Sequence, residues 1–349
     1  MLTIRDHFPA PLLSTPAHDL HKFLPGPTLC HLPGINPRPL FVSVLLHGNE
    51  TTGFVAIQNL LSRHSGRPLP RALSILIGNV AAARDRRRHL EGQPDFNRIW
   101  CGEGGAEFIM AGEVLSDMVR REVFAAIDIH NNSAANPEYA MVARLAPCNL
   151  ALGRMFSDKL VFFLQPQSSL TSAFADHCPA VTIECGLPDN PQGVERSVRF
   201  LDRLLRLESI PADPGPLENL DLFQIVAMLK VPGERPFGFD PNHQQDLCFL
   251  LDPPRQNFQR LPEGTVFALD PLGPGPILEV VDRSGADVAH RFFRMEGSRL
   301  ITTRPFVPAM LTLDQRIIRQ DCLGYILERV RHFPIDAPEI VDRRKRQEE

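Results

Sequence analysis

Four residues that could hold a metal ion and move protons stand where short apolar segments of the sequence end. His47 and Glu50 follow the apolar run 41–46, and His130 and Glu184 each end another such run. In open α/β sheets ligands bind at the carboxyl ends of the strands, so we expect these side chains to meet at one edge. Two imidazoles and one carboxylate are the ligands of many catalytic zinc sites, which keep a position open for water. The pattern predicts a zinc site in which zinc-bound water is the nucleophile and Glu184 the general base.

A second group of residues is basic. The run Arg84-Asp-Arg-Arg-Arg88 is followed by Asp95-Phe-Asn97-Arg98. In a hydrolase site, guanidinium groups can polarise the scissile carbonyl or bind a substrate carboxylate through paired hydrogen bonds. An arginine run can also be a solvated face or a phosphate-binding patch. This run is short and has no interleaved aromatic residues, and the chain carries a formal net charge of −4, so nucleic acid is the least favoured partner.

The elements that must position these residues alternate between apolar runs and helical periodicity. Strands are predicted at 41–46, 73–77, 124–129, 139–145, 160–164 and 180–183, and helices at 51–64, 107–122 and 191–208. This alternation is typical of an α/β fold with a largely parallel sheet covered by helices on both faces.

The sequence pattern changes near residue 211, where the alternation of strands and helices ends. Pro-Gly turns then separate short β-rich runs at 223–231, 266–269 and 277–281, and a helix is predicted at 321–332. We therefore expect four parts. They are an irregular Pro-rich segment at 1–35, a zinc-binding catalytic α/β domain at 36–210, a smaller β-rich domain at 211–335 and a tail at 336–349 that includes Arg343–Arg346.

Composition and cysteine usage favour the cytoplasm. The seven cysteines form no C-x-x-C pair and lie mostly in apolar surroundings, which favours buried free thiols in a reducing compartment. The N-terminus lacks the features of a signal peptide, and no apolar segment is long enough for a membrane span. We expect no membrane or nucleic-acid partner, and the sequence leaves open whether the chain forms a homo-oligomer.

Taken together, the motifs resemble those of the succinylglutamate desuccinylase/aspartoacylase family of the zinc carboxypeptidase superfamily. The resemblance covers residues 40–190 in order and in approximate spacing, through His47-Gly-Asn-Glu50, Arg88-His-Leu-Glu, Asp95-Phe-Asn-Arg98, Asp128-Ile-His130-Asn and Ile183-Glu184-Cys-Gly186. It implies a carboxypeptidase-like domain with a mixed, largely parallel sheet, followed by a β-rich C-terminal domain.

The resemblance also implies a role for each matching residue. One zinc ion per chain would lie on His47, Glu50 and His130, with Glu184 as the proton shuttle. Asp95 would orient His47, since such a partner fixes the ring and raises its basicity. The carbonyl-polarising arginine would be Arg88, and the substrate carboxylate would bind to Asn97 and Arg98.

Three departures from the family pattern leave alternatives open. The interval from Arg88 to Arg98 is two residues longer than is usual, so Arg87 or Arg86 could take the carbonyl-polarising role. A tyrosine that family members often supply from the C-terminal domain has no obvious match, although Tyr139 follows His130 closely enough to line the site. The amides of the segment 131–137 could bind substrate or could simply make turns.

Three functions are consistent with these residues. The leading hypothesis is a deacylase that hydrolyses the amide bond of a small, carboxylate-bearing N-acyl amino acid. A metallocarboxypeptidase that releases a C-terminal residue from a peptide would use the same chemistry. A metal-dependent binding protein without turnover is less favoured, because a degenerate site should have lost Glu184, and this residue is present.

Overall fold

The computed structural model describes residues 1–216, 220–233, 235–242, 247–270 and 277–330. The chain divides into two compact units. Among the described residues, the first consists of Met1–Asn131 and Glu138–Leu222, and the second of Asn132–Pro137 and Phe223–Val330. The predicted tail at 336–349 lies outside the described residues.

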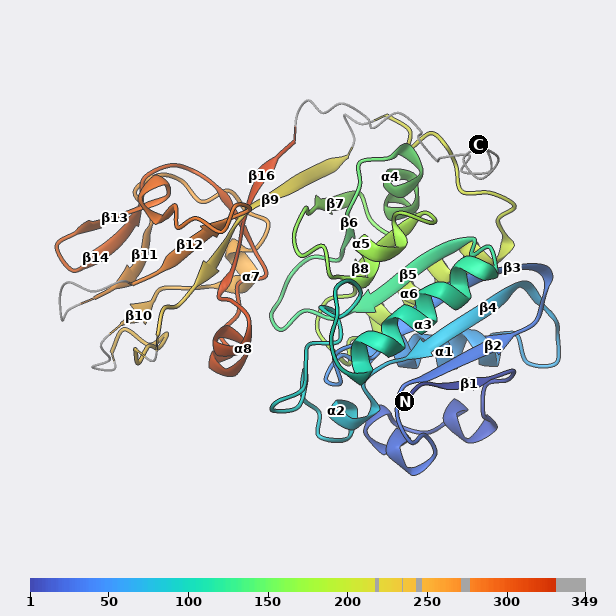
Figure 1. Ribbon diagram of the computed structural model, residues 1–349. Helices are drawn as coiled ribbons and strands as arrows, with labels where there is room; N and C mark the ends of the chain where they lie inside the picture. The colour runs from blue at the N-terminus through green and yellow to red at the C-terminus, as the bar shows by residue number, and fades with distance from the viewer. Residues whose placement is uncertain (217–219, 234, 243–246, 271–276, 331–349) are drawn as a thin grey trace. The chain divides into compact units, whose positions relative to one another are not determined.

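The first unit is a mixed, largely parallel sheet flanked by helices, as predicted (Figure 1). Its strands are β1 (Thr3–Arg5), β2 (Thr28–Leu32), β3 (Gly34–Val44), β4 (Leu69–Ile77), β5 (Ala125–His130), β6 (Tyr139–Val142), β7 (Lys159–Phe162) and β8 (Ala180–Glu184). They lie in the order β1-β2-β4-β3-β5-β8-β6-β7. The contacts of β2 with β4 and of β6 with β8 are antiparallel, and the other pairs among these eight strands are parallel.

Helices cover the sheet because its central strands are apolar on both faces. The helical elements of the first unit are the 3-10 helices η1 (Ala10–Leu13) and η2 (Ala17–Lys22) and the α-helices α1 (Thr52–Arg63), α2 (Val80–Arg84), α3 (Ala106–Arg120), α4 (Pro147–Arg154), α5 (Leu170–Phe174) and α6 (Pro191–Arg206). On one face, Phe41 and Ala126 share a core with α3 and α5. On the other face α1 packs so closely that a Cβ on Gly53 would touch Ile129 and Val44.

The N-terminal segment 1–35 is more regular than its prolines predict. It contributes β1 and β2 to the sheet and forms both 3-10 helices. The prolines stand at the ends of these elements: Pro9 and Pro16 immediately precede η1 and η2. A fixed φ suits the residue that enters a helix, so proline there starts a helix rather than preventing one.

The second unit is built mainly of antiparallel strands. One group comprises β9 (Asp221–Lys230, beginning in the first unit), β12 (Glu279–Asp282), β15 (Val307–Ala309) and β16 (Gly324–Arg329). A separate four-stranded sheet has the order β10 (Cys248–Phe249), β11 (Val266–Leu269), β14 (Arg299–Thr302) and β13 (Phe293–Glu296). The short helical elements are α7 (Pro253–Gln256), η4 (Ala289–Arg291) and α8 (Gln315–Gln320). Leucines and phenylalanines make up most of its core.

The prediction of a helix at 321–332 is wrong. Residues 324–329 form the strand β16, paired with β9 and β15, and the nearest helix, α8, ends at Gln320. Ile326 and Leu327 are buried in this sheet. A short apolar segment has no clear period of its own, so pairing with β9 decides its structure. Among the described residues, no helix is long and apolar enough to cross a membrane.

Candidate metal centre

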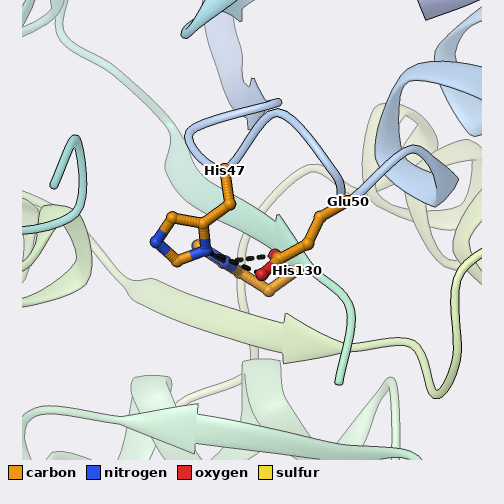
Figure 2. Close-up of side chains that lie close together, drawn as sticks. All are labelled: His47, Glu50 and His130. Atoms are coloured by element: carbon orange, nitrogen blue, oxygen red, sulfur yellow. Dashed lines mark hydrogen bonds and ion pairs between the residues drawn. The ribbon is translucent and has the colours of Figure 1, made fainter. Parts of the chain in front are cut away.

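The predicted metal ligands lie together at the carboxyl edge of the sheet. His47 and Glu50 stand in the loop between β3 and α1, and His130 is the last residue of β5. Because β3 and β5 are parallel neighbours, their carboxyl ends reach the same edge. The three side chains point toward one another (Figure 2). They form the only group of His, Cys, Asp and Glu side chains among the described residues that could hold a metal ion.

The atoms that converge are the two Nδ1 atoms and the Glu50 carboxylate. His47 Nδ1 is 2.7 Å from Glu50 Oε1, and His130 Nδ1 is 2.8 Å from Glu50 Oε2. The two Nδ1 atoms are 3.2 Å apart. All three side chains are buried. Buried donors packed this closely are expected where a cation binds between them, because a charge taken out of water must be compensated.

A carboxylate orients each imidazole by a hydrogen bond to the ring nitrogen that faces away from Glu50. The Nε2–H of His47 donates to Asp95 Oδ1 at 3.1 Å, as the resemblance implies, and the Nε2–H of His130 donates to Asp128 Oδ2 at 2.7 Å. These contacts place the proton on Nε2 and leave the Nδ1 lone pair for a metal. The partner of His130 was not predicted. Its signal is the spacing Asp-x-His within a strand, because residues two apart point to the same face.

Opposite charges within the cluster shift the pKa values of its members. Burial alone would lower the pKa of both histidines, but the carboxylates of Glu50 and Asp95 raise the pKa of His47, and those of Asp128 and Glu50 raise that of His130 well above its ordinary value. Burial would likewise raise the pKa of Glu50, yet the two imidazoles hold it far below the ordinary range. Without a metal, the site therefore favours protonated imidazoles around an ionised carboxylate.

Gly48 lets the ligand loop approach its neighbours closely. A Cβ at this position would overlap the backbone of Ala82 and Ala83 in α2. The Gly48 N–H donates to the carbonyl of Arg88 at 3.2 Å, so the same close approach brings the arginine segment beside the metal ligands. The glycine between His47 and Glu50 is therefore required by packing.

The arginine run separates into exposed residues and one residue inside the site. Arg88 is largely buried and donates to Asp95 Oδ2 through Nη2 at 2.9 Å and Nε at 3.2 Å. Asp95 thus links Arg88 to His47, and its pKa is far below the ordinary range: burial would raise it, but the two cations outweigh burial. Arg86 and Arg87 are exposed, and Arg86 lies beside His18. Of the three arginines considered, Arg88 is the one next to the candidate ligands.

Asn97, a predicted substrate-binding residue, also makes contacts within the protein. Its Oδ1 accepts the backbone N–H of Leu170 at 3.1 Å, and its Nδ2 lies 3.5 Å from His130 Nε2. Arg98 is partly buried, and its Nη1 donates to the carbonyl of Asn97 at 2.9 Å. Asn97 therefore braces the loop against α5 and the His130 ring, while Arg98 lies beside it on the same loop.

Glu184 stands between His130 and Tyr139 across the sheet. It is in register with His130 on β5 and with Tyr139 on β6, so the three side chains point to one face. Tyr139 is fully buried. Desolvation, reinforced by the Glu50 carboxylate, raises the pKa of Glu184 to about 7, in spite of the nearby imidazoles. A carboxyl group with such a pKa can both accept and release a proton near neutral pH.

This fold occurs in a known class of solved structures. The arrangement is similar to that of a succinylglutamate desuccinylase/aspartoacylase from Rhodobacter sphaeroides, with a TM-score of 0.60 and 17% identity over 87% of this chain and 89% of that one. The resemblance predicted from the motifs is thereby confirmed for the fold. No family model matches the sequence, and no curated protein does.

Two further structures show the same likeness. Murine aminoacylase 3 matches with a TM-score of 0.53 and 15% identity over 84% of this chain and 96% of that one. The product-bound ectoine utilization protein EutE from Ruegeria pomeroyi matches with a TM-score of 0.55 and 15% identity over 86% of this chain and 88% of that one. Identities this low establish the fold and leave the reaction to be argued from the site.

Proposed function

We propose that this chain is a zinc-dependent amide hydrolase that acts on a small, carboxylate-bearing N-acyl amino acid. The observation that carries the proposal is the convergence of His47 Nδ1, His130 Nδ1 and the Glu50 carboxylate at the strand edge, beside Glu184. The similar structures include a succinylglutamate desuccinylase/aspartoacylase and an aminoacylase, and this likeness supports the same class of reaction.

The donor set fits a zinc ion. Two neutral imidazole nitrogens and one carboxylate oxygen are the borderline and hard donors that zinc takes in catalytic sites, and Asp95 and Asp128 fix the required tautomers. The proposed holders of the ion are therefore His47, Glu50 and His130. When bound, zinc supplies a Lewis acid that polarises a carbonyl and lowers the pKa of water to about 7.

Glu184 is proposed to move the proton. As the carboxylate it accepts a proton from the attacking water, and as the acid it passes that proton to the leaving nitrogen. Without the second transfer, the tetrahedral intermediate reverts to substrate, because an amide anion is a poor leaving group. A pKa of about 7 suits both halves of the task.

The basic residues are proposed to bind the substrate. Arg88, held by Asp95, would stabilise the charge that develops on the carbonyl oxygen. Arg98 would bind the substrate carboxylate, with Asn97 holding the loop that carries it. This assignment makes the free carboxylate a requirement for tight binding.

A matched substrate panel tests the proposal. Zinc-loaded protein is assayed on N-acyl amino acids, on the same compounds with the carboxylate converted to a primary amide, and on peptides with a free C-terminus. The proposal predicts hydrolysis of the free acids, with a much higher KM for their amides. Preferential release of C-terminal residues from peptides would make the chain a carboxypeptidase, and zinc binding without turnover on any substrate would make it a binding protein.

A further inference from the structure

Asn131, the residue that follows His130, contacts all three segments that carry the proposed catalytic groups. It is buried, with 6% of its surface exposed. Its side-chain Nδ2 donates to Thr52 Oγ1 and to the carbonyl of Gly186, each at 2.9 Å, and its Oδ1 accepts the backbone N–H of Thr52 at 3.1 Å. Both amide hydrogens and the amide oxygen are thus used within the protein, so this amide is not available to bind substrate.

The contacts with Thr52 cap the helix that begins two residues after Glu50. Thr51, at the N-cap position of α1, makes no capping hydrogen bond through its own side chain. Asn131, the residue immediately after β5, supplies one by accepting the N–H of Thr52. The first N–H groups of a helix have no partner within the helix, so this bond fixes where α1 starts and hence the position of Glu50.

The backbone of Asn131 acts on the carboxylate of Glu50 itself. Its N–H donates to Glu50 Oε2 at 3.0 Å, the oxygen that also lies 2.8 Å from His130 Nδ1. An N–H aimed at a ligand oxygen restricts the rotation of the carboxylate, so the orientation of Glu50 depends on the position of residue 131.

The contact with Gly186 reaches the third segment. Gly186 lies two residues beyond Glu184, in a left-handed turn with φ of 74°. Its carbonyl accepts from Asn131 Nδ2. The amide of one residue therefore joins the end of β5 to the start of α1 and to the turn after β8, and each of these segments carries a proposed ligand or the proposed base.

We propose that Asn131 is a positioning residue, which holds Glu50 and Glu184 in register with His130 so that the three strand-end segments form one metal-binding site. This inference rests on the proposed function. It predicts that loss of the amide weakens zinc binding by about 10- to 100-fold, the range typical for residues that orient metal ligands. A purely structural role would lower thermal stability without changing the affinity of the folded protein for zinc.

Asn149 provides the matched control for Asn131→Ala. It is also a buried asparagine, with 2% exposed, and it also bridges two elements: its Oδ1 accepts the N–H of Ala180 at 3.2 Å, and its Nδ2 donates to the carbonyl of Arg144 at 3.4 Å. Ala180 begins β8, at the opposite end of that strand from Glu184. Asn149→Ala therefore removes comparable contacts away from the site.

The experiment compares zinc affinity, by chelator competition, and Tm for the wild-type protein, Asn131→Ala and Asn149→Ala. The inference predicts weaker zinc binding in Asn131→Ala alone, while both variants lose stability. Unchanged affinity in Asn131→Ala, or equal losses in both variants, would overturn it. Wild-type protein that binds no zinc would instead refute the proposed function, so the two failures are distinguishable.

A milder variant keeps the inference testable if Asn131→Ala does not fold. Thr52→Val retains the branched shape of the side chain but removes the hydroxyl that Asn131 binds. Zinc affinity should fall roughly threefold to tenfold, as expected for one lost hydrogen bond. An affinity equal to that of the wild-type protein would contradict the positioning role.

Discussion

At the scale of single residues, each histidine of the candidate metal centre is paired with a carboxylate that orients its ring. Asp95 fixes the ring of His47, and Asp128 fixes that of His130. These contacts matter to a metal site because they decide which nitrogen carries the lone pair. Glu184 differs from the ligands in that its proposed task is to exchange protons.

The change Glu184→Gln tests that difference. Glutamine keeps the shape of the side chain and can hydrogen-bond to water, but it cannot accept a proton. Turnover should fall by about 10²- to 10⁴-fold, the usual contribution of general acid–base catalysis, while zinc content and Tm stay near those of the wild-type protein. Measuring kcat, zinc and Tm on one preparation checks this. Lost zinc would make Glu184 a ligand, and a near-normal kcat would remove it from the mechanism.

Arg88 and Arg87 form a matched pair for the carbonyl-polarising role. Arg88 is bound to Asp95 beside the ligands, whereas Arg87 is exposed. Arg88→Ala should lower kcat by about 10²- to 10³-fold, as for the loss of a group that stabilises an oxyanion, and Arg87→Ala should leave kinetics unchanged. Steady-state kinetics on the best substrate decides the matter. A larger effect from Arg87→Ala would assign the role to the neighbouring residue.

At the scale of elements, the ligand loop depends on its close approach to α2. Gly48→Ala would force a methyl group into the backbone of Ala82, and overpacking of this kind costs about 1–3 kcal/mol of stability or more. Zinc affinity should fall as well, because the loop carries two ligands.

Gly112→Ala is the control for this change. Gly112 lies on the exposed side of α3 with open space around it, so alanine there should stabilise the protein by about 0.5–1 kcal/mol. Chemical denaturation of both variants, with zinc binding measured alongside, tests the contrast. Equal stability of the two variants would show that the loop tolerates movement.

Patterns along the chain predict the elements that carry the ligands, because each depends on local periodicity. Apolar runs that end in His130 and Glu184 can be recognised without knowing their partners. The contacts of Asn131 cannot, since Thr52 and Gly186 lie far from it in the sequence and become neighbours only through strand order. The helix prediction over 324–329 is wrong for the same reason, because pairing with β9 makes this segment a strand and no local pattern encodes that pairing.

At the scale of the whole molecule, zinc binding should be coupled to proton release. The carboxylates around His47 and His130 raise the pKa of both imidazoles in the metal-free protein, so protons compete with zinc for the two Nδ1 atoms. Affinity should therefore rise with pH, by roughly 10- to 100-fold per unit while one or two protons are displaced. Zinc titrations in buffers of different ionisation enthalpy measure this. Imidazoles titrate between about pH 6 and 8, so a zinc affinity that is independent of pH across that range would contradict the proposed ligands.

The most direct test of the proposed function is to titrate zinc into metal-free protein while following hydrolysis of an N-acyl amino acid. The account predicts a rate that rises from near zero and saturates at about one zinc per chain, the stoichiometry of a single three-ligand site, and no comparable rise with Glu50→Ala. A rate that is already full without zinc, or that the Glu50→Ala variant reproduces, would contradict it.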